Sequence, residues 1–193
     1  MGSPVEIARY LIKLAASGET PDFLDHMRLQ KLLYYVQGWH LATFGTPLFS
    51  GHIQAWTYGP VVKEVYPVFA DYQRCSIPPD QEGSDPVSLS AADCAFVEGV
   101  WDAYKDHSTT KLSKMTHSEA PWREARKGLP PDARSDNEIT HESMRLFFSA
   151  EMEKRQIPGL SASGAYRALE QFEKGGGRRH DEVFARLRKS DVL

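Results

Sequence analysis

Several signatures of enzymes, secreted proteins and membrane proteins are missing from this sequence. It has only two cysteines, Cys75 and Cys94, and no CxxC pair, which excludes the common cysteine-based zinc sites and a disulfide framework. HExxH zinc motifs, GxSxG nucleophile elbows and Walker loops are also absent. No apolar run approaches the ~18 residues of a membrane helix, and the N-terminus does not read as a signal peptide. These absences favour a cytoplasmic protein that is not an enzyme, has no membrane segment and needs no metal ion or cofactor.

Charge is distributed unevenly along the 193 residues. The formal net charge is −3, but residues 155–193 hold eight Lys and Arg against five Asp and Glu, which leaves the preceding residues at −6. An acidic body argues against a nucleic-acid clamp, since phosphate contacts need a basic face. We therefore expect one body over residues 1–154 and a separate basic appendage over residues 155–193.

The densest apolar and aromatic stretch is residues 27–69. Its first half predicts a helix, because apolar residues recur at helical spacing from Leu29 onward and aromatic residues widen the stripe until little of the helix is polar. Asp25 is suited to cap the start of this helix, and Gly45 to end it in the left-handed conformation. A helix that is apolar on most sides is buried on most sides, so we expect this one at the centre of the fold.

The second half of the stretch predicts a strand followed by a helix. Residues 53–58 carry alternating β-branched and aromatic side chains, as a short strand does. Gly59 breaks the strand, and Pro60 suits the first turn of a helix, where its missing N–H costs nothing. We therefore expect a third helix from Pro60, ended or kinked by Pro67. The residues that it would bury are Val61, Val62, Val65, Tyr66 and Phe69.

Helical spacing and capping residues predict the remaining elements. Ser90 and Ser108 are the expected N-caps of two of the helices. Helices are expected over residues 5–16, 90–104, 109–115 and 138–154, with a short turn over 121–126 and loops over 73–86 and 128–135. In the tail, residues 163–174 and 181–189 predict two short amphipathic helices. The expected fold is therefore mainly α, a compact bundle of about six helices with a short β-hairpin or strand pair, plus a C-terminal two-helix basic appendage.

Four segments together resemble a known family. They are LQKLLYYVQGWHL (residues 29–41), IQAWTYGPVVKEVY (53–66), LSKMTHSEAPWREA (112–125) and the closing IT…MRLFF (139–148). In this order the segments resemble the Panacea antitoxin domain of SocA-like and phage-associated GepA-like proteins, over residues 4–153. The resemblance implies an antitoxin of a bacterial or prophage type II-like toxin–antitoxin pair, which neutralises a co-encoded toxin by direct protein–protein binding.

Two other functions stay open at this point. One is a proteolytic adaptor that delivers the toxin to an energy-dependent protease. The other is a DNA-binding regulator that contacts phosphates through the basic tail, although no helix-turn-helix pattern supports a nucleic-acid partner. The basic residues concerned are Arg178, Arg179, Arg186, Arg188 and Lys189.

The expected toxin contacts combine aromatic residues of the central stretch with apolar residues of the tail. The central stretch holds more large aromatic residues than one helix and a short strand can bury, and Trp and Tyr dominate protein–protein hot spots. The tail helices each carry an apolar stripe that needs a surface. The expected toxin-binding residues are Tyr34, Tyr35, Tyr58, Lys63, Leu169, Phe172, Phe184 and Leu187.

A second group of residues is expected to be structural. His117 and Glu119 match half of a zinc deaminase signature, but its cysteine half is missing, so they are expected to bond backbone groups beside an anchoring Trp122. Arg28 and Lys31 are expected on a solvated rim or at the border of a binding face. The full structural set is Trp39, His40, Trp56, Gly59, Pro60, His117, Glu119, Pro121 and Trp122.

Overall fold

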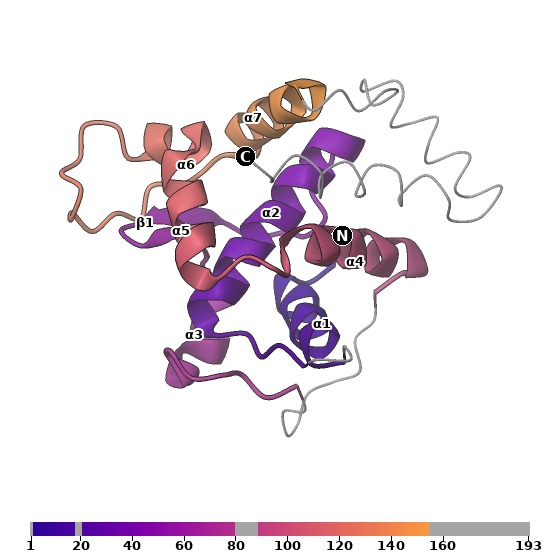
Figure 1. Ribbon diagram of the computed structural model, residues 1–193. Coiled ribbons are helices and arrows are strands. Elements are labelled where there is room, and N and C mark those ends of the chain that lie inside the picture. Colours follow the sequence, from indigo (N-terminus) through magenta and orange to yellow (C-terminus); the bar gives the residue numbers. More distant parts are fainter. Residues whose placement is uncertain (1, 18–20, 80–88, 155–193) are drawn as a thin grey trace.

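The computed structural model describes residues 2–17, 21–79 and 89–154 (Figure 1). The two helices expected in the basic tail lie outside the described residues. So do four of the expected toxin contacts, Leu169, Phe172, Phe184 and Leu187.

The centre of the fold is helix α2, His26–Phe44, as its apolar circumference predicted. The Asp25 carboxylate caps it by accepting a hydrogen bond from the Arg28 N–H at 2.7 Å, and Gly45 ends it at φ +72°. Four helices of ten residues or more pack directly against α2, so that it is buried along most of its length (Figure 1). They are α1 (Pro4–Ala16), α4 (Ala91–Tyr104), α5 (Thr109–Ser118) and α7 (His141–Lys154).

Serine residues cap the three helices α1, α4 and α5. Ser3 and Glu6 form a reciprocal capping box at the start of α1. The Ser90 hydroxyl accepts from the Asp93 N–H at 3.1 Å, and Ser108 caps α5 in the same way. The two caps predicted from the sequence are therefore confirmed, because capping depends on residues only two or three positions apart.

The segment after α2 forms an antiparallel hairpin of β1 (Ile53–Trp56) and β2 (Gly59–Val62). The predicted helix from Pro60 is therefore wrong. Gly59 takes φ +103°, which lets the chain reverse within two residues, and the valines that follow it suit a strand. Helix α3 is limited to Tyr66–Phe69, followed by the 3₁₀ turn η1 (Ala70–Tyr72).

Pro67 and the start of α7 also differ from the prediction. Pro67 lies in the first turn of α3, where it needs no N–H, instead of interrupting a longer helix. Helix α7 begins at His141 and not at Glu138, because the preceding residues pair with the edge of β1. The N–H of Ile139 donates to the carbonyl of Ile53 at 2.7 Å.

Helix α7 lies against α2 at Gly38, where the missing side chain makes room for the ring of Phe148. That ring packs against Trp39, Tyr34 and Tyr35 of α2, with centroid distances of 5.0, 5.5 and 6.1 Å. Edge-on aromatic contacts of this kind add to the burial free energy. The α2–α7 interface is therefore built from aromatic rings around one glycine.

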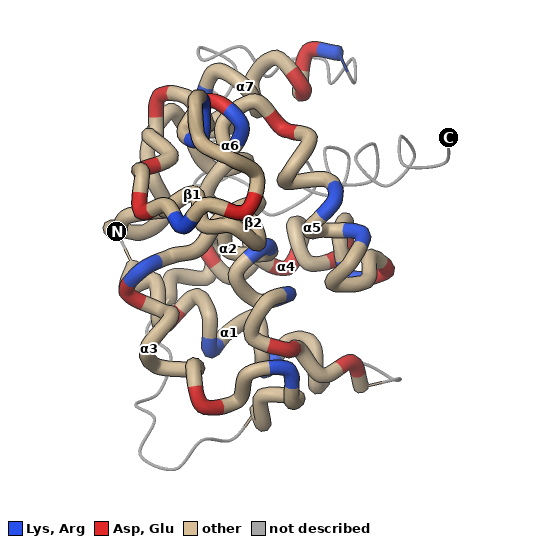
Figure 2. The backbone as a smooth tube through the Cα atoms, turned by 90° about the vertical axis from the view of Figure 1, so that its left-hand side faces the viewer, with Lys and Arg blue, Asp and Glu red and all other residues tan. Residues whose placement is uncertain are grey.

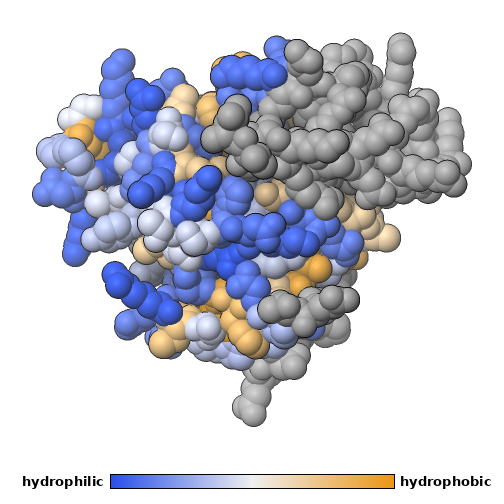
Figure 3. Space-filling model, viewed as in Figure 1, coloured by the Kyte–Doolittle hydropathy of each residue, from blue (hydrophilic) through white to orange (hydrophobic). Residues whose placement is uncertain are grey.

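The surface of the described part is mixed in character. Acidic and basic positions alternate over the body instead of forming one basic face (Figure 2). The face seen in Figure 3 is mainly hydrophilic, with small apolar areas in its lower half. Within the described ranges, no helix is long and apolar enough to cross a membrane.

Gly38→Ala tests the α2–α7 interface. In an exposed helix this change gains about 1 kcal/mol from helix propensity. Here a Cβ would stand 2.1 Å from Cε2 of Phe148, so we expect unfolding to become easier by about 1–3 kcal/mol. Urea denaturation measures the free energy of unfolding that Gly38→Ala loses, both in the wild-type protein and in a Phe148→Leu protein. The loss should be smaller in the Phe148→Leu protein, which lacks the aromatic ring. A stabilised Gly38→Ala protein would contradict this packing.

Candidate functional site

Three segments that carry the family resemblance meet around Lys31. This residue lies on α2, and its side chain is 1% exposed, so its expected place on a solvated rim is wrong. Its Nζ donates to the carbonyl of Pro60 in β2 at 3.1 Å. Thr116 of α5 closes the group from a third element. The amine of Lys31 therefore holds the hairpin against the central helix.

Gly59 fits this arrangement for two reasons. Its φ of +103° disfavours other residues, and a Cβ at this position would lie 2.6 Å from Cε of Lys31 and 3.1 Å from Oγ1 of Thr116. The turn approaches α2 so closely that only glycine fits without a shift. The Lys31 side chain and the hairpin are thus mutually positioned.

The electrostatic environment of Lys31 is unusual for a buried amine. Burial lowers its pKa to about 7, although Asp25 opposes the shift by favouring the charged form. Within the described ranges, Lys31 forms no ion pair with a carboxylate, and its hydrogen bond is to a neutral carbonyl. The amine is therefore charged in only part of the molecules near neutral pH.

His117 and Trp122 support the hairpin from the side of α5 and α6 (Ala120–Ala125). Their rings are stacked, with centroids 4.2 Å apart, and Nε1 of Trp122 donates to the Trp56 carbonyl at 3.0 Å. Burial lowers the pKa of His117, and the charges of Lys31 and Arg126 lower it further. A neutral His117 is thus a packing partner of Trp122.

Arg126 and Glu119 complete this support. The buried guanidinium of Arg126 donates to the carbonyls of Ala55 at 3.0 Å and Ala133 at 2.7 Å, and it lies over the ring of Trp122. Oε1 of Glu119 accepts from the Tyr35 hydroxyl at 2.8 Å. In the part of the chain that the structure describes, no three His, Cys, Asp or Glu side chains are grouped to hold a metal ion.

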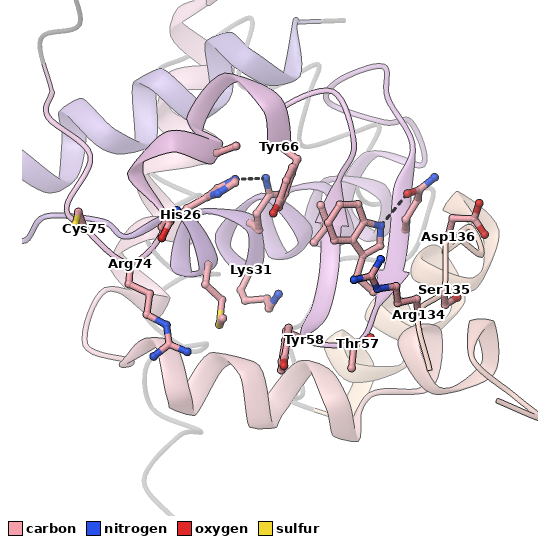
Figure 4. A pocket seen from close by; sticks show the side chains of 17 residues that line it. His26, Lys31, Thr57, Tyr58, Tyr66, Arg74, Cys75, Arg134, Ser135 and Asp136 are labelled. Atoms are coloured by element: carbon pink, nitrogen blue, oxygen red, sulfur yellow. Dashed lines mark hydrogen bonds between the residues drawn. The ribbon is translucent and has the colours of Figure 1, made fainter. Parts of the chain in front are cut away.

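A pocket of about 970 Å³ opens beside the hairpin, with Lys31 at its base. Figure 4 shows the Lys31 side chain extending from α2 into the space between Tyr58 and Tyr66. The ring of Trp56 lies beside that of Tyr66, with centroids 4.6 Å apart, and forms part of the wall. The exposed rim carries Arg74, Arg134 and Asp136. The pocket thus combines aromatic walls with a buried amine and further charged groups at its rim.

The predicted toxin contacts of the body are placed differently from one another. Tyr34 and Tyr35 are buried in the core, because α7 covers their side of α2, so they offer no exposed surface and the expectation for them is corrected. Tyr58 is 72% exposed at the hairpin turn, and Lys63 is exposed just after β2.

The remaining structural set lies in the core or beside it. Trp39 is buried, and its Nε1 donates to the Tyr104 hydroxyl at 2.9 Å. His40 is half-buried against Phe44 and Phe96 and hydrogen-bonds to the Thr46 carbonyl at 2.6 Å. Pro121 is buried in the first turn of α6, where its missing N–H costs nothing, and Pro60 lies in β2 opposite Ala55.

Sequence reasoning missed Lys31, although a signal was present. The central helix is apolar on most sides, and the same observation requires its few polar residues to be buried too. Those buried polar residues include Gln30, Lys31 and Gln37. A lysine inside such a helix needs an internal partner, which in this fold is the hairpin.

The comparisons with known proteins agree with this arrangement. Residues 29–123 match the family described as "Antitoxin SocA-like, Panacea domain". This part of the chain is therefore similar to a Panacea domain, and the predicted resemblance is confirmed. Lys31, the hairpin and Trp122 all fall within the matched residues.

One curated relative has a stated role. A stretch of 64 residues is 39% identical to "Antitoxin SocA" of Caulobacter vibrioides (strain NA1000 / CB15N). The stretch covers 33% of this chain and 33% of that relative, so the chain is matched to about a third of the relative's length. No solved structure matches the chain.

The pH dependence of stability tests the burial of Lys31. Unfolding restores its ordinary pKa of 10.5 from about 7, so the unfolded state binds more protons between these two pH values. The free energy of unfolding should therefore rise with pH in this window, by at most about 1.4 kcal/mol per pH unit, and Lys31 should add no slope below about pH 7.

Urea denaturation between pH 7 and 9.5 measures this contribution as the difference between wild type and Lys31→Met. The matched control is Lys63→Met, because Lys63 is exposed and its replacement should leave the slope unchanged. Identical slopes for wild type and Lys31→Met would show that Lys31 is solvated.

Proposed function

We propose that this protein is the antitoxin of a bacterial or prophage toxin–antitoxin pair and that it neutralises a co-encoded toxin by binding it. The observation that carries the proposal is the similarity to a Panacea domain over residues 29–123, together with the relative named as an antitoxin. Binding, and not catalysis, is the proposed activity.

The hairpin and α3 offer a suitable contact surface for a toxin. Tyr58 is 72% exposed, and Tyr66 and Val68 of α3 are 38% and 41% exposed. Tyr58 and Tyr66 line the same pocket, so their surfaces are continuous across its mouth. Exposed aromatic groups of this kind dominate binding energy in protein–protein interfaces.

The same surface is held in place before any partner arrives. Oε1 of Gln30 accepts from the Val62 N–H at 2.7 Å, and Lys31 holds Pro60 beside it. A contact surface that is already ordered loses less conformational entropy on binding than a flexible loop does. The hairpin turn therefore supports the proposal better than the buried Tyr34 and Tyr35.

Fewer observations support the adaptor and the DNA-binding alternatives. The basic residues of the DNA-binding alternative lie in residues 155–193, outside the described residues. Over the described body, acidic and basic positions are interspersed (Figure 2). Direct binding of a toxin is therefore the function that we propose.

Co-expression with the adjacent reading frame tests the proposal. That frame alone should arrest growth, and wild-type antitoxin should restore it and co-purify with the toxin. Tyr58→Ala should weaken toxin binding at least tenfold, because truncating a hot-spot residue costs about 2 kcal/mol or more. Calorimetry on the purified pair measures the affinity, and toxin half-life measured in the same cells separates occlusion from delivery to a protease.

The matched control is Leu146→Ala on α7, which removes a side chain that is also exposed, at 57%, but lies on another element. Both variants should melt within about 2 °C of wild type. If no neighbouring product is toxic, or if wild type neither binds nor neutralises it, the proposed function is wrong. If Tyr58→Ala and Leu146→Ala weaken toxin binding equally, the result gives no support for the hairpin as the toxin-binding surface.

A further inference from the structure

We propose that the pocket beside the hairpin binds a small organic anion, a phosphate or carboxylate group carried on an aromatic ring, with the anionic group on Lys31. The inference stands on the pocket itself and does not depend on the identity of any toxin.

The first argument is the unfilled bonding capacity of Lys31. An ammonium group has three N–H donors, and Lys31 uses one of them on the Pro60 carbonyl. No carboxylate of the described residues forms an ion pair with this amine, although its side chain is 1% exposed. Lys31 is directed toward the base of the pocket that it lines (Figure 4), where an anion would lie next to the remaining donors. A buried amine that forms no ion pair favours a bound anion, because the anion stabilises its charged form and water screens the interaction only weakly.

The second argument is the shape and lining of the pocket. Its volume of about 970 Å³ falls within the range of small-molecule sites, and it exceeds what one inserted acidic side chain would fill. The rings of Trp56 and Tyr66 form one wall, and Tyr58 lies at the mouth. Aromatic walls favour a flat ring over an aliphatic chain.

The third argument is the charge at the rim. Arg74 and Arg134 stand there against one carboxylate, Asp136, so the pocket including Lys31 carries an excess of positive charge. Burial lowers the pKa of His26, the one imidazole of the lining, and so disfavours its charged form. The mouth therefore attracts an anion, and the base binds it.

Calorimetry on the purified full-length protein tests this with phenyl phosphate and benzoate as probes. We expect at least one of them to bind with a Kd of about 1 mM or below, and at least tenfold more tightly than inorganic phosphate and acetate, which lack the ring. Lys31→Met should weaken that binding at least tenfold. Arg134→Gln, at the exposed rim, should weaken it a few-fold without changing the melting temperature.

The matched control is Lys63→Met, which removes an exposed lysine that does not line the pocket. Its binding should equal that of wild type. The proposal is overturned if neither probe binds, if ring and ringless anions bind equally, or if Lys63→Met weakens binding as much as Lys31→Met. The proposal is also overturned if wild type binds no probe and Lys31→Met loses toxin binding. In that case the pocket is part of the toxin interface and not a small-molecule site.

Because Lys31→Met also removes the bond to Pro60, Arg134→Gln provides the second readout. Arg134 makes no hydrogen bond or ion pair to the described residues, so its loss leaves the hairpin intact. Two results together would contradict the proposed anion site. They are an Arg134→Gln protein that binds the probe as tightly as wild type, and a Lys31→Met protein whose fold is altered.

Discussion

Burying α2 on nearly every side forces its polar side chains to find partners inside the protein. Gln30, Lys31 and Gln37 all do so by hydrogen-bonding to the backbone of residues 48–62. A buried polar group without a partner costs about 1–3 kcal/mol, so each of these bonds is expensive to break. The central helix therefore determines where the chain after Gly45 can run, and this constraint shapes the rest of the fold.

The site depends on that constraint. Once the hairpin is fixed on α2, its outer edge pairs with the residues before α7, and Trp122 and Arg126 pack on its other side. Segments separated by up to a hundred residues thus meet around one turn. The pocket beside the turn follows from the same arrangement, because its base is α2 and its wall is β1.

The sequence predicted the caps and helix ends, which depend on residues close together in the chain. It failed for the hairpin turn, which depends on contacts between distant segments. The caps at Ser90 and Asp25 and the stop at Gly45 follow from residues a few positions apart, and all three were predicted. Gly59-Pro60 satisfies the rules for both a helix start and a hairpin turn. Contact with Lys31 and Thr116 selects the turn, and no local pattern contains that contact.

Lys31 is not explained by stability alone. A methionine at this position would fill similar space without a charge to desolvate, and replacing buried charges by apolar residues of similar size is often neutral or stabilising. The bond to Pro60 offsets only part of the cost, since a hydrogen bond to a neutral carbonyl contributes less than one to a carboxylate. Burying the charged amine costs free energy, and an anion bound in the pocket would offset that cost by stabilising the charged form. A buried lysine that lines a cavity and forms no ion pair within the described residues is the arrangement that the proposed anion site requires.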